Sequence, residues 1–324
     1  MDMIKLAKEI IEGRRLSEAE DLSFFEDCDL DDLLRGADMI RAHFNGDKVD
    51  LCTIINARSG KCGENCKYCA QSVHYKTNCE VYDFLDEEEI LKSARENYKA
   101  GVDRFAIVTS GRALSGEEFE KCLRSFKLIR KECPGLGLCA SLGLLSREQF
   151  EALKNAGVSR IHNNIETSPS FFPSICTSHT IKDKLNTIEN ARLAGLDVCS
   201  GGIFGLGESF KQRIEMALTL SKIDVVSIPI NVLIAIKGTP LEGMPHLEED
   251  EILRSIAMFK YINPAANVRL AGGRILVDKA GKRAFNSGAS ASITGNMLTT
   301  SGYTIESDRR MLSSMHRELA KAAN

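Results

Sequence analysis

Short apolar runs rich in β-branched residues alternate with amphipathic helical segments along most of this chain, from about residue 50 to residue 293. The alternation repeats at intervals of roughly 30 residues, which is typical of strand–helix units with parallel strands and right-handed crossovers. Units repeated this often favour a closed barrel over an open sheet, and 324 residues suffice for one barrel with short extensions. We therefore predict an α/β fold, a TIM-type (β/α)8 barrel, with later strands at residues 104–108, 137–139, 158–161, 198–203, 225–230, 268–271 and 291–293.

The helices of these units carry start signals. Ser115 with Glu118, and Ser146 with Gln149, have the spacing of a capping box, in which two side chains satisfy the first free backbone N–H groups of a helix. Asp86 is a suitable N-cap for another helix. These signals predict helices that begin directly after residues 86, 115 and 146.

The two ends of the chain differ from the repeating region. Residues 1–45 have apolar side chains at helical spacing and no strand between them, so we predict an N-terminal helical extension that packs outside the barrel. We place the barrel at residues 46–300 and expect a helical C-terminal tail at residues 301–324.

Charge and cysteine usage limit the classes of function. A net charge of −3 gives no electrostatic reason to expect nucleic acid or a membrane as a partner. Charged residues occupy the start of the chain, where a signal peptide needs an apolar run, and no stretch of about 18 apolar residues is present. Eleven cysteines, an odd number in a chain of this length, do not indicate a disulfide framework. We expect a soluble protein of the reducing cytoplasm.

Three cysteines stand close together directly after the first apolar run. Cys62, Cys66 and Cys69 lie at spacings of four and three residues on a polar, glycine-containing stretch. A structural zinc site needs four ligands, usually from two CxxC pairs, and no second pair is near. A cubic iron–sulfur cluster held by three thiolates instead leaves one iron free to bind a small molecule. We favour such a cluster, with zinc and incidental cysteines as the alternatives.

Polar and cysteine residues follow the expected strands at the points where those strands end. In (β/α)8 enzymes the chemistry lies at this carboxyl end of the barrel. The pattern therefore predicts one polar, cysteine-rich mouth, formed by residues 62–69, Thr109 and Ser110, Cys139, residues 163–166, Cys199, Asn231 and Arg269.

The cysteine loop also carries a family resemblance. CxxxCxxC with Tyr68 before Cys69 resembles the radical S-adenosylmethionine (SAM) superfamily, and the run of residues 62–72 followed by Tyr75-Lys-Thr77 is similar to the biotin synthase family. The resemblance covers residues 50 to 300. It implies a 4Fe-4S cluster whose free iron binds SAM, dethiobiotin as substrate, and sulfur insertion from an auxiliary iron–sulfur cluster. It also implies an electron donor such as flavodoxin or ferredoxin, and a homodimer.

The resemblance assigns individual positions. For the SAM site it implies Tyr68, Thr109, Ser110, Asn164, Glu166, Lys184, Ile203, Gly205 and Glu208. For the substrate site it implies His162, Asn163, Asn164 and Asn231. Glu166 stands where an Asp is familiar, and Lys184 replaces the two-pronged contact of an Arg with a single ammonium group. Alternatively, Glu208 simply starts a helix after a glycine-rich turn, and His162 is an ordinary buried histidine.

For the auxiliary cluster, Cys139, Cys199 and Arg269 match family ligands, whereas Ala106 stands where a further cysteine is usual. Cys133 precedes Cys139 by six residues, so we predict Cys133 as the third thiolate. Three thiolates suit a four-iron cluster with an extra sulfide, as in the family variant associated with obligate anaerobes, better than the usual 2Fe-2S alternative. Among the other cysteines, Cys79 and Cys176 are reserve ligands, and Cys52 and Cys122 are expected to pack in the core.

Two other functions stay open on the sequence alone. One is another radical SAM enzyme on the same barrel, for example in hydrogenase maturation or amino-acid rearrangement, which need not share Cys139, Cys199, Arg269 and Asn231. The other is a zinc-stabilised binding protein without catalysis, which would be colourless after anaerobic purification.

Overall fold

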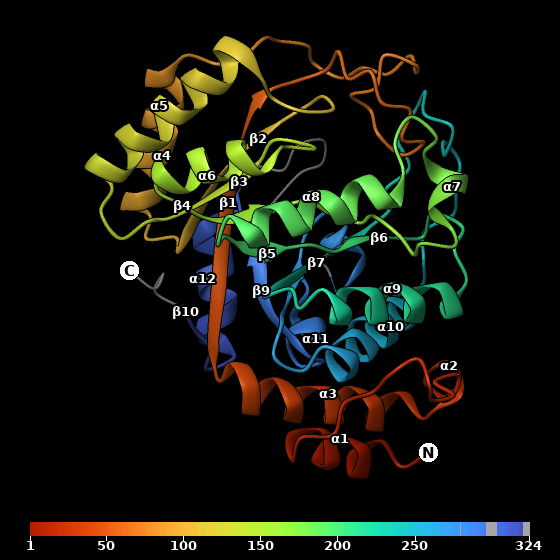
Figure 1. Cartoon of the computed structure of the whole chain (residues 1–324). Coiled ribbons are helices and arrows are strands. Elements are labelled where there is room, and N and C mark those ends of the chain that lie inside the picture. The colour runs from red at the N-terminus through yellow and green to blue at the C-terminus, as the bar shows by residue number, and fades with distance from the viewer. Residues whose placement is uncertain (279, 296–302, 320–324) are drawn as a thin grey trace.

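The computed structural model describes residues 1–278, 280–295 and 303–319 and has a barrel of parallel strands surrounded by helices (Figure 1). The barrel strands are β1 (Lys48–Arg58), β2 (Arg104–Thr109), β3 (Gly137–Ser141), β4 (Val158–His162), β5 (Asp197–Cys199), β6 (Gly202–Phe204), β7 (Ser227–Val232), β8 (Asn267–Leu270) and β9 (Ala289–Ile293). The helices that follow or connect them are α4 (Glu87–Lys99), α5 (Gly116–Glu132), α6 (Arg147–Asn155), α7 (Phe172–Ile175), α8 (Ile181–Leu193), α9 (Phe210–Lys222), α10 (Glu249–Ile262), the 3-10 turn η1 (Arg274–Leu276) and α11 (Lys282–Phe285).

Pairing of the first strand with the last closes the sheet. Each strand pairs in parallel with the next around the ring, and Asp50 to Cys52 of β1 pair with Ala291 to Ile293 of β9. The closed, all-parallel ring confirms the predicted (β/α)8 barrel.

One predicted strand is interrupted. The run 198–203 forms β5 and β6, separated at Ser200 and Gly201, and both pieces pair with β7. A Cβ atom on Gly201 would lie 2.0 Å from the Pro229 carbonyl oxygen, so only glycine permits this approach. The two pieces together occupy the fifth strand position of the barrel.

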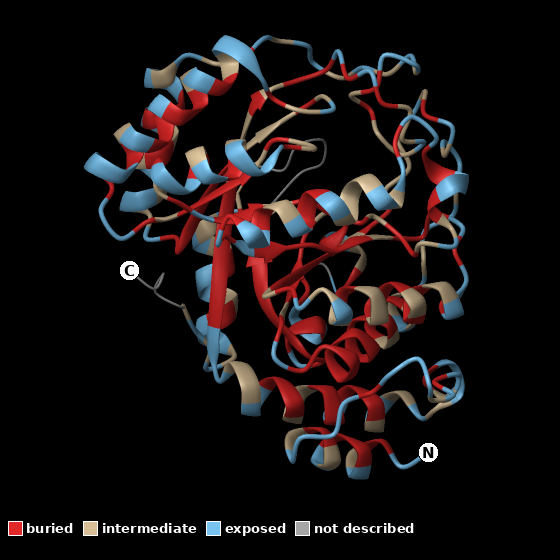
Figure 2. Ribbon diagram, viewed as in Figure 1, coloured by how far each residue is buried: buried red, intermediate tan, exposed pale blue. Residues whose placement is uncertain are grey.

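The helices begin where the sequence signals place them, but two caps lack a side-chain hydrogen bond, Asp86 before α4 and Ser115 before α5. Ser146 and Gln149 form the predicted capping box of α6. Ser115 precedes α5 without a side-chain cap, and Glu118 instead forms an ion pair with Arg58 at the end of β1. Helices such as α4 and α6 bury one face against the barrel, whereas α10 is buried on both sides because α3 packs against it (Figure 2). No helix within the described residues is long and apolar enough to span a membrane.

The first 45 residues form α1 (Met3–Ile11), α2 (Phe24–Asp27) and α3 (Leu30–Asn45), at the end of the barrel where β1 begins (Figure 1). They are fixed to α10, where the Tyr261 hydroxyl donates to the Met3 carbonyl at 2.9 Å. At the other end of the chain, α12 (Ile305–Ser314) and β10 (Glu318–Leu319) follow the barrel, and β10 pairs with the start of β1. Residues 301–302 and 320–324 of the predicted tail lie outside the described residues. The domain boundaries at residues 45 and 300 stay predictions.

Candidate active site

A cavity of about 340 Å³ lies inside the barrel and extends towards the carboxyl ends of its strands. Because side chains alternate along a strand, every second residue faces this space. Its mouth is lined by Tyr68 and Cys69 of the loop after β1, and its floor by Arg104, Arg160 and Arg269. The cavity thus connects the cysteine loop with the barrel interior.

The cysteine loop is folded back on itself by backbone hydrogen bonds. The Cys62 N–H donates to the Gln71 carbonyl at 3.0 Å, and the Val73 N–H donates to the Cys62 carbonyl at 2.8 Å. The Cys69 N–H donates to the Cys66 carbonyl at 3.0 Å, which forms a turn between these two cysteines. The loop therefore presents three thiols from one compact segment, and this soft donor set fits an iron–sulfur cluster with three protein ligands.

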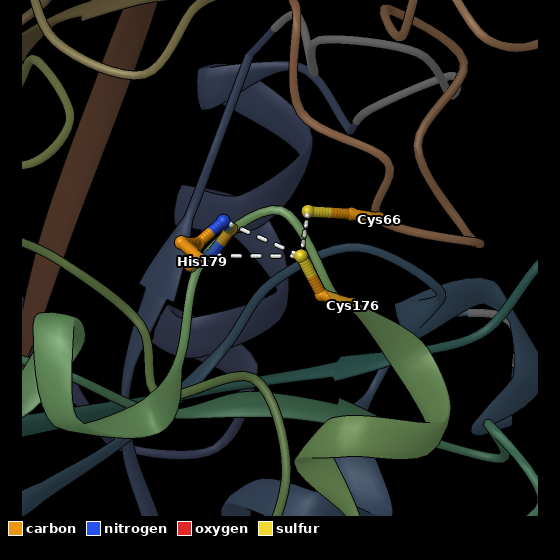
Figure 3. A group of neighbouring side chains, drawn as sticks. All are labelled: Cys66, Cys176 and His179. Atoms are coloured by element: carbon orange, nitrogen blue, oxygen red, sulfur yellow. Dashed lines mark hydrogen bonds between the residues drawn. The ribbon is translucent and has the colours of Figure 1, made fainter.

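A second segment packs against this loop and brings Cys176 and His179 next to Cys66 (Figure 3). The Cys66 and Cys176 sulfurs are 3.7 Å apart, and the Cys176 sulfur lies 3.3 Å from His179 Nδ1. Hydrogen bonds from Cys66 and His179 lower the pKa of Cys176 to about 3. Zinc would need a fourth ligand, and no further ligand atom joins these three among the described residues. As a reserve auxiliary ligand, Cys176 is misplaced, because it lies at the loop rather than inside the barrel.

Glu64, between the first two loop cysteines, holds the second segment in place. Its buried carboxylate accepts hydrogen bonds from the Ser178 hydroxyl, His179 Nδ1 and Arg112. Sequence reasoning missed Glu64 and His179, because the contacts that Glu64 makes with Arg112 and His179 join residues more than 40 positions apart.

Glu166 and Asn164 lie beside the cavity in a constrained loop after β4. Glu166 has a φ of +68°, in the left-handed region that is uncommon for residues other than glycine. Backbone bonds to Gly201 and Ile203 hold it there, and a Cβ atom on Gly202 would lie 2.2 Å from the Glu166 carbonyl oxygen. Asn164 accepts from the Gly201 N–H at 3.0 Å and donates to the Glu166 carboxylate at 3.3 Å. The side chains predicted for SAM are thus held in fixed positions on the cavity wall.

His162 and Asn163, on neighbouring positions, face opposite ways. His162 lines the cavity, where burial lowers its pKa to about 4, so its imidazole is neutral at pH 7. Asn163 is not among the cavity-lining residues and donates to the Gly143 carbonyl at 3.0 Å. The position of Asn163 therefore argues against the predicted substrate contact, and the reason is the alternation of side chains along β4.

The residues predicted to hold SAM at strand 2 and α8 lie next to the cavity rather than on its wall. The Thr109 hydroxyl is buried and has no hydrogen-bond partner among the described residues, as expected for a group that awaits a ligand. The Ser110 hydroxyl donates to the Gly60 carbonyl at 2.7 Å and so anchors the cysteine loop. Lys184, in the first turn of α8, is half-buried and close enough to His162 to lower the pKa of that residue.

The glycine-rich turn after β6 is held together by Glu208. Its carboxylate accepts the N–H groups of Gly205 and Leu206 at 2.9 and 2.7 Å and pairs with Arg213 at 2.7 Å. Both charged side chains are only 2% exposed. Ile203 lines the cavity directly before this turn. Glu208 does not start the helix as the alternative had it, because Ser209 is the N-cap of α9; Glu208 instead holds the turn beside the cavity wall.

Asn231 of β7 lines the cavity beside Ile203 of β6, with which it pairs. Its Nδ2 donates to the Gly202 carbonyl at 3.1 Å, and its Oδ1 accepts from the Gly272 N–H at 2.9 Å. The side chain therefore connects two neighbouring strand ends, and one further hydrogen on Nδ2 remains for a ligand.

The floor of the cavity is strongly basic. Arg104, Arg160 and Arg269 lie 3.3, 3.1 and 3.1 Å from one carboxylate oxygen of Asp50. Although burial alone would raise it, these guanidinium groups hold the pKa of Asp50 below its usual range. The nitrogens of Arg269 also donate to Ser227 and Ser292, so the structure places this predicted residue at the floor with its nitrogens bonded to protein.

Cys139 and Cys199 line the cavity, but Cys133 does not. Cys133 follows the last residue of α5, where its N–H donates to the Ile129 carbonyl at 2.8 Å and its side chain packs in the main apolar core. The Pro-Gly turn comes before β3 begins, which puts Cys133 at the wrong end of the barrel. Cys52, which we expected in the core, lines the cavity instead. The reserve candidate Cys79 is half-buried beside Ser59, away from the barrel interior.

Comparisons with known proteins agree with this architecture. Residues 57–220 match the radical SAM superfamily, and residues 229–318 match the Biotin and Thiamin Synthesis associated domain. Solved structures of methylornithine synthase (TM-score 0.83, 20% identity, 97% of each chain) and of the [FeFe]-hydrogenase maturase HydG (TM-score 0.84, 15% identity, 99% of this chain and 76% of that one) share the fold.

Much closer relatives are found by sequence. Biotin synthase of Alkaliphilus metalliredigens (strain QYMF) is 53% identical, over 97% of this chain and 99% of the relative. Biotin synthase of Clostridium beijerinckii is also 53% identical, with the same two coverages. The chain belongs to the biotin synthase family of the radical SAM superfamily.

Proposed function

We propose that this chain inserts sulfur into dethiobiotin to form biotin, with SAM bound at the mouth of the cavity and the sulfur source at its floor. The observation that carries the proposal is one continuous cavity with thiols at both ends, Cys69 at the mouth and Cys139 and Cys199 inside. A carbon radical needs its sulfur donor within contact distance before anything else quenches it. One cavity between two thiol sites meets that requirement.

Cys62, Cys66 and Cys69 would hold a 4Fe-4S cluster, and Cys139 and Cys199 would hold an auxiliary iron–sulfur cluster. When bound, the first supplies the electron that cleaves SAM to a 5′-deoxyadenosyl radical, and the second supplies sulfur. The barrel wall excludes water and competing hydrogen donors from that radical.

The chain's own side chains orient the two organic molecules. Asn164 and Glu166 are fixed beside the mouth and suit the ribose hydroxyls of SAM, while the unpartnered Thr109 hydroxyl and the cation of Lys184 suit its amino and carboxylate groups. Tyr68, Ile203 and the Gly205 turn supply apolar surface for the adenine. Neutral His162 and Asn231 can exchange hydrogen bonds with the uncharged ureido ring of dethiobiotin.

For the auxiliary cluster we favour a four-iron form with an extra sulfide, with 2Fe-2S as the alternative. The methyl group of Ala106 faces the cavity and leaves space where a larger side chain would project. The basic floor formed by Arg104, Arg160 and Arg269 suits an anionic group above it.

We further propose a homodimer in the cytoplasm, supplied with electrons by a flavodoxin or ferredoxin. Free thiols at all eleven cysteines support a reducing compartment. The dimer and the donor rest on the family alone.

The function is tested by incubating anaerobically reconstituted protein with SAM, dethiobiotin and a strong reductant. We expect mass spectrometry to find 5′-deoxyadenosine and biotin together. Deoxyadenosine without biotin, from protein that holds both clusters, would reject dethiobiotin as the substrate.

A further inference from the structure

We propose that Cys52 of β1 is the third thiolate ligand of the auxiliary cluster, together with Cys139 and Cys199. The inference rests on the proposed function, because it assigns a ligand to a cluster that this function requires. It assigns to a residue of β1 the place that we predicted for Cys133, which follows α5.

The layering of the barrel carries the proposal. Side chains inside a (β/α)8 barrel stack in layers of four, and alternate strands contribute the members of each layer. Because β5 and β6 share one position, the odd strand positions are β1, β3, β5 and β8. These strands present Cys52, Cys139, Cys199 and Arg269 to the cavity. Each of the four alternate strands thus contributes one residue to a single layer of the barrel interior. Three of these four residues carry thiols.

Cys52 is not packed like the structural cysteines of this chain. Cys122 and Cys133 are buried in the main apolar core between the barrel and its helices. Cys52 and Cys139 instead form a small separate cluster with Ala106, flanked by Ile54 and Val108. A thiol that only filled space would be expected among the aliphatic side chains of the main core, and Cys52 faces a cavity instead.

The basic floor matches three thiolates. Three guanidinium groups meet one carboxylate oxygen of Asp50 beneath the cysteines, and Arg160 also lies 3.9 Å from the more exposed carboxylate of Asp197. One nitrogen of Arg160 and one oxygen of Asp50 are buried with no partner among the described residues. Each thiol loses its proton when it binds iron, and the resulting thiolates place negative charge beside these guanidinium groups.

Alanine at position 106 makes room for this arrangement. In the sheet, Ala106 pairs with Cys139 of β3 on one side and with Ile54 of β1 on the other. Its side chain ends at the methyl group, and it packs in one small cluster with Cys52 and Cys139. β2 lies between β1 and β3, and its small side chain at position 106 leaves room for a cluster that is bound by residues of both neighbouring strands.

The test isolates the auxiliary cluster in the full-length chain. The three loop cysteines, Cys62, Cys66 and Cys69, are replaced by alanine, and the protein is reconstituted anaerobically with iron and sulfide. Iron and sulfide per chain, the visible absorption spectrum and the EPR spectrum after reduction are then measured. Into this background we introduce Cys52→Ala, with Cys139→Ala as the positive control and Cys133→Ala as the matched negative control.

We expect Cys52→Ala to lose as much iron as Cys139→Ala does, and Cys133→Ala to keep the iron content and spectra of the background. Full iron with unchanged spectra in Cys52→Ala would overturn the assignment. A background protein that binds no iron at all would instead reject the auxiliary cluster, and with it the proposed function. Cys52→Ser has nearly the same side-chain volume and controls for loss of iron through misfolding. Its metal-free form should have the melting temperature of the background protein, and its visible absorption bands should shift or disappear.

Discussion

Replacing Cys66 by serine is expected to reduce SAM cleavage to background. Cys66 lies at the centre of the loop whose backbone bonds gather three thiols, and a cluster with three protein ligands cannot spare one. The measurement is 5′-deoxyadenosine formed per chain by reconstituted protein under a strong reductant. Iron content should fall in parallel, because the loop cluster is lost while the auxiliary site remains.

Cys176→Ala is the matched control for this prediction. Its sulfur lies 3.7 Å from that of Cys66, so position alone does not distinguish a ligand from a neighbour. As a neighbour, Cys176 should affect cluster affinity by no more than about 10- to 100-fold, and cluster-loaded protein should still cleave SAM. If Cys176→Ala abolished cleavage and Cys66→Ser did not, Cys176 would be the ligand.

Glu208→Ala is expected to destabilise the protein by about 3–5 kcal/mol, because it removes the buried carboxylate from Arg213 and leaves that charge only its more exposed partner Glu251. The same change removes the acceptor of two backbone N–H groups in the turn after β6. Urea unfolding of the variant and the parent measures the difference in the free energy of unfolding. The turn lies beside Ile203 on the cavity wall, so SAM binding should weaken as well.

Arg147→Ala is the control for a pair that is not buried. Arg147 and Glu151 form an i,i+4 ion pair with both side chains about half exposed, and its loss should cost no more than about 0.5 kcal/mol. Equal effects of Glu208→Ala and Arg147→Ala would show that burial of the Glu208 pair contributes nothing.

The repeated strand–helix units were sufficient to predict the barrel, because periodicity and capping are local properties of a sequence. Ser146 with Gln149 behaves as its spacing predicts. Ser115 with Glu118 does not, since Arg58 lies within reach of Glu118 only after the barrel has closed. A local pattern cannot reveal such a competitor.

The same limit explains why the sequence favoured Cys133 as the third auxiliary ligand, whereas we propose Cys52 from the structure. Sequence proximity to Cys139 favoured Cys133, but the turn between them places the two residues on different sides of the barrel wall. Cys52 is 87 positions from Cys139, as their residue numbers show, and reaches the same cavity only because β1 and β3 contribute to one layer. Alternation along β1, with Cys52 and Ile54 both facing inwards, was the signal that could have identified it.

The most direct test of the central claim follows one sulfur atom from the protein into the product. The protein is reconstituted with sulfide enriched in a heavy sulfur isotope, freed of unbound sulfide, and reacted once with SAM and dethiobiotin. We expect the biotin formed to carry the heavy isotope, because the proposed function takes the sulfur from the auxiliary cluster. Biotin with only natural-abundance sulfur, formed by protein whose clusters are fully labelled, would contradict this account.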